Sequence, residues 1–284
     1  KMKLFTNMLP IIKSKTVVMQ IRFSLVLPVL WLIQICLIFV GSSGCHDTET
    51  ANSTPPTSAK QIRKLIKRLS SSQSKEIQNT IQDLRKIGDP VIPALIQALS
   101  SNNVQLRAHA AKALPVIGIG AHEAIPVLIQ ALGDPHAEVR QQAAFSLGLI
   151  GALTTVQPSG AIYPSAEETV IALIATLQDE DLNVRSNAAS ALGMLGEVAE
   201  SAVPALIRVL NAPEARFRAD AVAALGLIGT PVKLVISTLT QALDDQNQDV
   251  QQCARFHLER IGTFEALQPS TRINNSKRIF PPKR

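Results

Sequence analysis

The sequence has few of the residues from which most catalytic sites are built. Only 4% of its 284 residues are aromatic, with one Trp and one Tyr, and there are three cysteines and five histidines. It contains no Gly-x-Ser-x-Gly elbow, no phosphate-binding glycine loop, no dinucleotide-binding glycine pattern and no Cys-x-x-Cys pair. These absences argue against elbow-type hydrolases, nucleotide hydrolases, dinucleotide-dependent enzymes and thiol-redox proteins. No catalytic residue and no metal site is predicted.

Basic charge is lacking from the body of the chain, although the formal net charge is +6. Ten of the 28 Lys and Arg lie at the two ends: Lys1, Lys3, Lys13, Lys15, Arg22, Arg272, Lys277, Arg278, Lys283 and Arg284. The other 18 face 22 Asp and Glu, which leaves the body at about −4. With no basic stripe and few aromatic rings for base stacking, the body is not expected to bind nucleic acid.

The sequence does have an internal repeat. Segment 139–151 (VRQQAAFSLGLIG) returns at 184–196 (VRSNAASALGMLG), and more loosely at 106–118 and 217–229. The closing glycines stand at positions 88, 118, 151, 196, 229 and 262, and most gaps are near 33 residues. A period of that length is typical of stacked two-helix units. The sequence therefore predicts an all-α solenoid of about six two-helix repeats, which offers a long surface to partners.

Each unit is predicted to hold two antiparallel helices. The first follows Pro93, Pro126 or Pro204, because a proline in the first turn costs no helical hydrogen bond. The second carries paired alanines that permit close helix packing, and a Gly at its end suits a positive φ. A recurring leucine is expected to fill the core; its positions are Leu114, Leu147, Leu192, Leu225 and Leu258.

These residues resemble HEAT-like repeats, in particular the short type of the phycobilisome-lyase-like proteins. The likeness covers about residues 75–262, and the first unit departs from it by having Ile77 where the others have Arg. The resemblance implies a scaffold that binds proteins and that itself holds no cofactor. The alternative that it implies is a phycobilin lyase-like factor handling a tetrapyrrole on a phycobiliprotein partner. Di-iron hydroxylases of this fold use repeated His-Glu pairs, and the single pair at His122 supplies too few ligands.

HEAT repeats typically pair an Asp in the turn with an Arg six residues on, forming a ladder between units. Asp134, Asp179 and Asp245 are the ladder or capping candidates. Their possible partners also stand as partner-binding candidates, together with the only tyrosine: Arg107, Arg140, Arg185, Arg218 and Tyr163. Two arginines lack the Asp six residues before them, and Asp245 lacks the Arg six residues after it. The sequence therefore does not establish a continuous ladder. Tyr163 lies in an insertion at 152–167, which is either a binding loop or a neutral one.

The first 45 residues are predicted to be a signal or anchor segment. Residues 23–40 are almost wholly apolar, basic residues precede them, and Met19 is a possible true start. The sequence Ser43-Gly44-Cys45 resembles the end of a bacterial lipobox, in which the cysteine is lipidated, whereas Ser42 departs from it. An uncleaved signal anchor is the alternative. Both place the repeats on the non-cytoplasmic side of a bacterial envelope membrane; a cytoplasmic-facing body is the third arrangement.

The remaining segments frame the repeats. Residues 46–58 are polar and are predicted to be a flexible tether, and residues 268–284 a basic disordered tail. Residues 59–74 form a basic amphipathic helix, which either caps the repeat domain at 75–267 or lies on anionic lipid. The function predicted from the sequence is a membrane-tethered scaffold for an unidentified protein partner.

Overall fold

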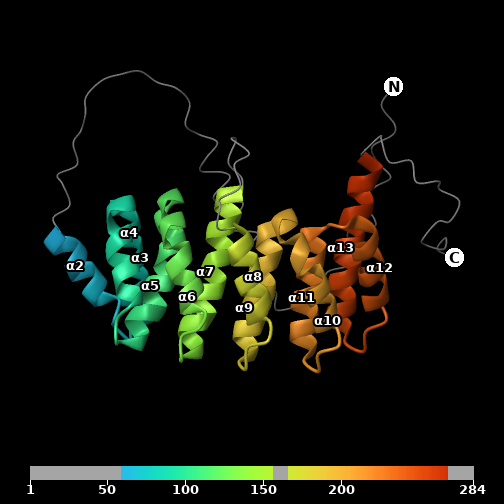
Figure 1. Cartoon of the computed structure of the whole chain (residues 1–284), viewed down its shortest axis with the longest axis horizontal. Coiled ribbons are helices and arrows are strands. Elements are labelled where there is room, and N and C mark those ends of the chain that lie inside the picture. Colours follow the sequence, from blue (N-terminus) through green and yellow to red (C-terminus); the bar gives the residue numbers. More distant parts are fainter. Residues whose placement is uncertain (1–58, 156–165, 268–284) are drawn as a thin grey trace, which may run out of the picture. The chain divides into compact units, whose positions relative to one another are not determined.

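The computed structural model describes residues 59–155 and 166–267, and every regular element in these ranges is a helix (Figure 1). Twelve α-helices alternate along the chain between two rows. The first row holds α2 (Ala59–Arg68), α4 (Ile92–Leu99), α6 (Ile125–Ala131), α8 (Ala166–Thr176), α10 (Val203–Val209) and α12 (Val232–Ala242). The second holds α3 (Ser74–Ile87), α5 (Val104–Ile117), α7 (Ala137–Thr155), α9 (Leu182–Leu195), α11 (Ala215–Ile228) and α13 (Gln248–Leu267). These pairs form six stacked units, which confirms the predicted all-α solenoid.

The helices begin and end where local chemistry requires. Pro93, Pro126 and Pro204 lie in the first turns of α4, α6 and α10, as predicted. The second-row helices α5 and α9 are capped by Asn103 and Asp181, whose side chains accept from backbone N–H groups of the first turn. For α9 the cap is thus Asp181 and not Asp179, and the first turn of α13 donates to Asn247 and not to Asp245. Asp134, Asp179 and Asp245 instead each accept from the backbone N–H two residues on, within the turn.

Four of the closing glycines end a helix with a positive φ, as predicted: Gly88, Gly118, Gly196 and Gly229. The other two are exceptions. α7 continues through Gly151 to Thr155, and α13 continues through Gly262 to Leu267. Three 3-10 turns, η2 (Asp89–Val91), η3 (Ile119–Ala124) and η4 (Gly196–Ala202), lead from a second-row helix into the next first-row helix.

The core is one continuous cluster that runs from Leu65 to Ala254. The predicted leucines Leu114, Leu147, Leu192 and Leu225 are at most 1% exposed. Leu258 is only half-buried, because α13 belongs to the last unit in the described part and no further helix covers it. The core is thus shared between units, as a stacked repeat requires.

Second-row helices pack on one another much more closely than first-row helices do. Small residues make this possible: a Cβ at Gly148 would lie 2.6 Å from Ala191 Cα, and a Cβ at Gly193 would lie 3.0 Å from Ala224 Cα. We call α3, α5, α7, α9, α11 and α13 the inner row, and the others the outer row.

Residues from Pro55 onward form one compact unit. The predicted leader, Cys45, the tether, Tyr163 and the basic tail lie outside the described residues. Within the described ranges, one stretch, Leu182–Val209, has the length and apolar character of a membrane span. It consists of α9, η4 and α10, it is kinked at Ala199, and half of its apolar window is buried, so it belongs to the solenoid core.

Candidate protein-interaction surface

A ladder of ion pairs joins the turns along one edge of the stack. Arg107 donates from Nε and Nη2 to the two carboxylate oxygens of Asp134, at 2.7 and 3.0 Å. The same two-pronged contact recurs further along the stack, in the pairs Arg140–Asp179 (2.7 and 2.9 Å) and Arg218–Asp245 (2.8 and 2.7 Å). Each arginine therefore reaches the aspartate of the following unit, and this planar geometry suits a guanidinium better than an ammonium.

The remaining rung uses a different acceptor. Arg185 donates to Glu214 Oε1 at 2.8 Å and lies over the ring of Phe217 at 5.3 Å from its centroid. Glu214 thus replaces the aspartate that is missing at Ala212. With this rung, four consecutive inner-row helices, α5 to α11, are each linked to the next unit, so the ladder is continuous over α5–α13.

The six-residue spacing between the turn residue and the arginine reflects a hydrogen bond from the arginine to the backbone, and not the expected pair of side chains. Arg107, Arg140, Arg185 and Arg218 each donate from Nη1 to the carbonyl oxygen six residues earlier, at Ser101, Asp134, Asp179 and Ala212. Gln251 does the same to Asp245 O. A backbone acceptor exists whatever side chain is present, so Ser101 and Ala212 serve as well as Asp. The prediction that the Asp134 side chain pairs with Arg140, and the Asp179 side chain with Arg185, was therefore wrong.

The three aspartates are held ionised in the fold. Burial, the largest single effect, would raise the pKa of Asp134 and of Asp179. Hydrogen bonds from Arg107 and Arg140, backbone hydrogen bonds from His136 and Asp181, and the arginine charges together outweigh it and lower both pKa values. Hydrogen bonds from Arg218 lower the pKa of Asp245. Because the folded-state pKa is lowered, ionisation of these carboxylates stabilises the fold at pH values above the ordinary pKa of 3.8. This stabilisation is lost as the pH falls through the folded-state pKa.

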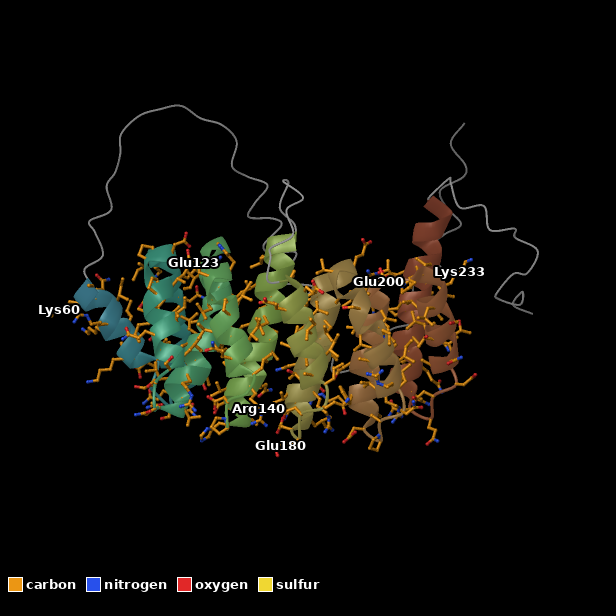
Figure 2. All side chains as sticks on the ribbon, in the orientation of Figure 1. Lys60, Glu123, Arg140, Glu180, Glu200 and Lys233 are labelled. Carbon is orange, nitrogen blue, oxygen red and sulfur yellow. The ribbon has the colours of Figure 1, made fainter. Side chains whose placement is uncertain are left out.

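These contacts use much of the hydrogen-bonding capacity of the arginines. Arg140 is 7% exposed, and besides Asp179 it contacts Glu180 at 3.1 Å, at the edge labelled in Figure 2. A partner-binding role for the four arginines stays a prediction, as does any role for Tyr163.

The inner face also exposes an apolar strip, which the sequence analysis did not single out. Met194 Cε lies against Gly148, and Leu227 Cδ1 lies against Gly193, so large side chains of one helix rest on the glycine of the preceding helix. Leu227 is 40% exposed and Phe256 is 50% exposed. We define the apolar strip by the following residues of α7, α9, α11 and α13: Phe145, Leu149, Leu153, Met194, Leu227 and Phe256.

Polar contacts between neighbouring inner-row helices lie nearer the ladder edge. Gln105 Nε2 donates to Glu138 Oε2 at 2.9 Å, and Arg216 Nη1 donates to Asn183 Oδ1 at 3.2 Å. These residues occupy the second position of their helices, and the strip residues lie seven to fifteen positions further on. The inner face therefore carries a polar band beside an apolar band.

Three titratable groups, one buried and two half-buried, lie on the inner row near its C-terminal end. Burial, with the positive charge of Arg260, lowers the pKa of His257 to about 4, and its Nδ1 has no hydrogen-bond partner among the described residues. Burial raises the pKa of Asp220 despite the opposing effects of Ser186 and Arg216. Burial, together with Asp220, raises the pKa of Cys253 to about 12, which makes that thiol a poor nucleophile.

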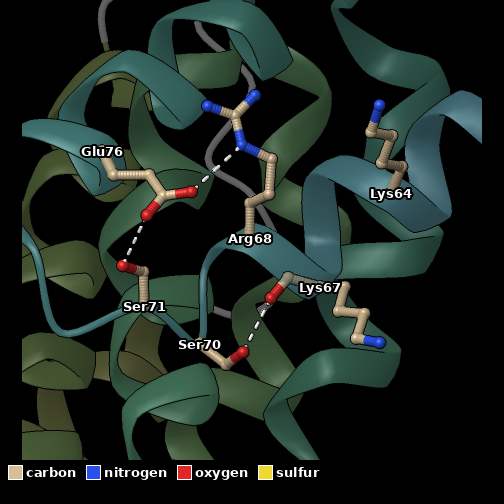
Figure 3. A pocket seen from close by; sticks show the side chains of 6 residues that line it. All are labelled: Lys64, Lys67, Arg68, Ser70, Ser71 and Glu76. Atoms are coloured by element: carbon tan, nitrogen blue, oxygen red, sulfur yellow. Dashed lines mark hydrogen bonds and ion pairs between the residues drawn. The ribbon is translucent and has the colours of Figure 1, made fainter.

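The described residues contain a shallow pocket of about 330 Å³ at the first unit (Figure 3). Lys64, Lys67, Arg68, Ser70, Ser71 and Glu76 line it. Glu76 accepts from Arg68 Nε at 3.4 Å and from Ser71 Oγ at 2.7 Å. In the same described ranges, no group of three or more His, Cys, Asp or Glu could hold a metal ion.

The repeat geometry agrees with comparison to known proteins. The family model for HEAT repeats matches residues 62–148, 125–226 and 172–259. The chain is a HEAT-repeat protein. This HEAT-repeat chain has no match among curated protein sequences.

Solved structures show the same architecture. An engineered protein is 24% identical, with a TM-score of 0.53 over 71% of this chain and 96% of that one. Escherichia coli YibA is 19% identical, with a TM-score of 0.55 over 78% and 81%. Kap95p, solved with RanGDP, is 16% identical, with a TM-score of 0.52 over 81% of this HEAT-repeat chain and 32% of the solved one. At these identities the likeness shows the fold alone.

Proposed function

We propose that this HEAT-repeat protein is a membrane-tethered scaffold that binds a protein partner along its inner row. The observation that carries the proposal is the apolar strip, in which the exposed Leu153, Leu227 and Phe256 are joined by half-buried apolar side chains on the same row of helices. Together they form an elongated surface for another protein. Kap95p, a structural neighbour, binds RanGDP. The membrane tether rests on the apolar run at 23–40 and on the candidate lipidation site Cys45.

The binding part of the proposal is tested by photo-crosslinking in cells of the native kind. A photo-reactive residue replaces Leu227 on the inner row, and in a matched variant it replaces Leu234 on outer-row helix α12. The two leucines are 40% and 41% exposed, so the variants differ in face and not in accessibility. We expect a discrete protein adduct from position 227 that is lost when Phe256→Asp is added in the same chain.

Equal adducts from both positions, or none from either, would contradict binding along the inner row.

The tether is tested separately by the intact mass and membrane partition of the native chain. A mass that begins at Cys45 with added acyl groups would support a lipoprotein, and an intact chain in the membrane fraction would support a signal anchor. An unprocessed cytosolic chain would contradict the tether.

A further inference from the structure

Helix α2 carries an unusual concentration of positive charge. Five of its ten residues are basic and none is acidic. Lys60, Arg63, Lys64 and Lys67 are exposed. In the part of the chain that the structure describes, no carboxylate pairs with these four, whereas Arg68 pairs with Glu76.

The apolar side of α2 is already occupied. Leu65 and Leu69 are 7% and 0% exposed, and Ile62 and Ile66 pack against the same core. An amphipathic helix that lies in a bilayer must bury its apolar face in lipid. In this fold α2 cannot do so, because that face is the first layer of the solenoid. Only its charged face is presented outward, so any binding through it is electrostatic.

The pocket beside α2 has a matching chemistry. Lys64 and Lys67 contribute ammonium groups suited to phosphate oxygens, and the Ser70 hydroxyl beside them donates to the carbonyl oxygen of Lys67 at 2.7 Å. Glu76 holds the Arg68 and Ser71 side chains on one side of the pocket (Figure 3). The two lysines therefore supply charge without a carboxylate partner next to a hydroxyl-lined recess.

The chain before α2 identifies the surface that would meet it. The apolar run 23–40 is joined to α2 by residues 41–58. A polar joining segment of that length spans about 20–25 Å root-mean-square as a random coil. If the apolar run or a lipidated Cys45 sits in a bilayer, the cations of α2 lie on average at about that distance from the headgroups. The headgroups are then at a high effective concentration around these cations.

We propose that the exposed cations of α2 dock the first end of the solenoid on a membrane surface that contains anionic phospholipid. The proposal rests on the tether for proximity only, and not on what the inner row binds. Each Lys or Arg close to such a surface contributes about a fivefold gain in affinity. Docking should vanish at about 1 M salt, where the Debye length is about 3 Å.

The test is lysine footprinting of the full chain with lipid nanodiscs. Acetylation rates are measured by mass spectrometry in discs of phosphatidylcholine alone and in discs that also contain phosphatidylglycerol. Lys60, Lys64 and Lys67 are the reporters, and Lys233, exposed on α12 at the other end of the stack, is the internal control (Figure 2). We expect the reporter rates to fall several-fold in anionic discs and to recover at high salt, while the Lys233 rate stays unchanged.

Charge reversal supplies the second arm. Arg63→Glu leaves all three reporters in place and should abolish most of their protection, whereas Lys233→Glu should leave it intact. Both changes are on exposed side chains, so circular dichroism should show an unchanged helix content.

The outcomes separate this inference from the tether. A chain retained by neutral discs but with equal reporter rates in both lipids would overturn docking and leave the tether standing. Protection in anionic discs without retention by neutral ones would support docking and overturn the tether. Stronger protection by soluble polyglutamate than by anionic discs would overturn the lipid assignment and point to an acidic protein.

Discussion

At the scale of single residues, His257 differs from its counterparts. Inner-row glycines Gly148 and Gly193 face Ala191 and Ala224, but Gly226 faces the imidazole of His257. The ring is 4% exposed and packs edge-on against Phe256, with ring centroids 5.1 Å apart. Only the neutral imidazole suits this environment, because burial and the positive charge of Arg260 disfavour protonation.

The pH dependence of stability follows from this burial. The folded-state pKa of about 4 lies below the ordinary 6.5, so the unfolded chain binds the proton first as the pH falls. Stability should therefore drop by about 2 kcal/mol between pH 7 and pH 5. Urea denaturation at the two pH values measures it, with hydrogen exchange of α13 as the local readout. His257→Ala should remove most of the difference, and His136→Ala, at an exposed histidine, should retain it. An equal pH dependence in all three chains would contradict the assignment.

At the scale of elements, side-chain size on the inner row determines how closely the helices pack. Gly148, Gly193 and Gly226 each leave no room for a side chain, since the next helix occupies the space where a Cβ would lie. The outer row has no such requirement, and its helices are spaced more widely. The close packing of α7, α9 and α11 on the helices that follow them thus depends on one glycine in each.

A larger residue at this position should be costly. Gly148→Val places new atoms on the Ala191 backbone, and overpacking of this kind costs about 3 kcal/mol. Gly133→Ala is the control, because its Cβ would meet only Gln130 O at 3.5 Å, an ordinary contact. Thermal unfolding of the two variants measures the difference. A Gly148→Val chain as stable as Gly133→Ala would show that the helices can separate freely.

The elements were predictable from the sequence because their signals are local. Repeated prolines, alanine pairs and closing glycines specify where helices begin, touch and end within a few residues. The contacts between units were less accessible. The distance from Arg107 to Asp134 is 27 residues, and the insertion lengthens it to 39 for Arg140 and Asp179. No local pattern reveals that register, nor that Glu214 would replace a missing aspartate.

At the scale of the whole molecule, the ladder adds charged links between units that also share apolar contacts and a few neutral hydrogen bonds. Arg140 spans the junction between α7 and the unit of α8 and α9, where the insertion interrupts the repeat. Its side chain and that of Asp179 are 9% and 11% exposed, whereas Glu214, the partner of Arg185, is 36% exposed. The Arg140 rung is therefore less hydrated than the Arg185 rung.

Removing the buried rung should uncouple the two halves. Arg140→Ala leaves the Asp179 carboxylate without its partner, which costs about 3 kcal/mol, while Arg185→Ala loses a more exposed pair worth about 1 kcal/mol. Hydrogen exchange under increasing denaturant should show α3–α7 and α8–α13 opening at separate concentrations only in Arg140→Ala. A single shared transition in both variants would rule out the rung as the coupling element.

The ladder also stops at both ends, and this limits how far the protein can grow by self-association. The first inner-row helix has Ile77 at the arginine position, and the last has Gln251, which cannot form a charged pair. A second copy stacked on either end would find no ion pair to complete, and at the first end it would meet the positive charge of α2. A repeat array with identical ends could polymerise into filaments, whereas the two ends described here offer no charged pair through which copies would join.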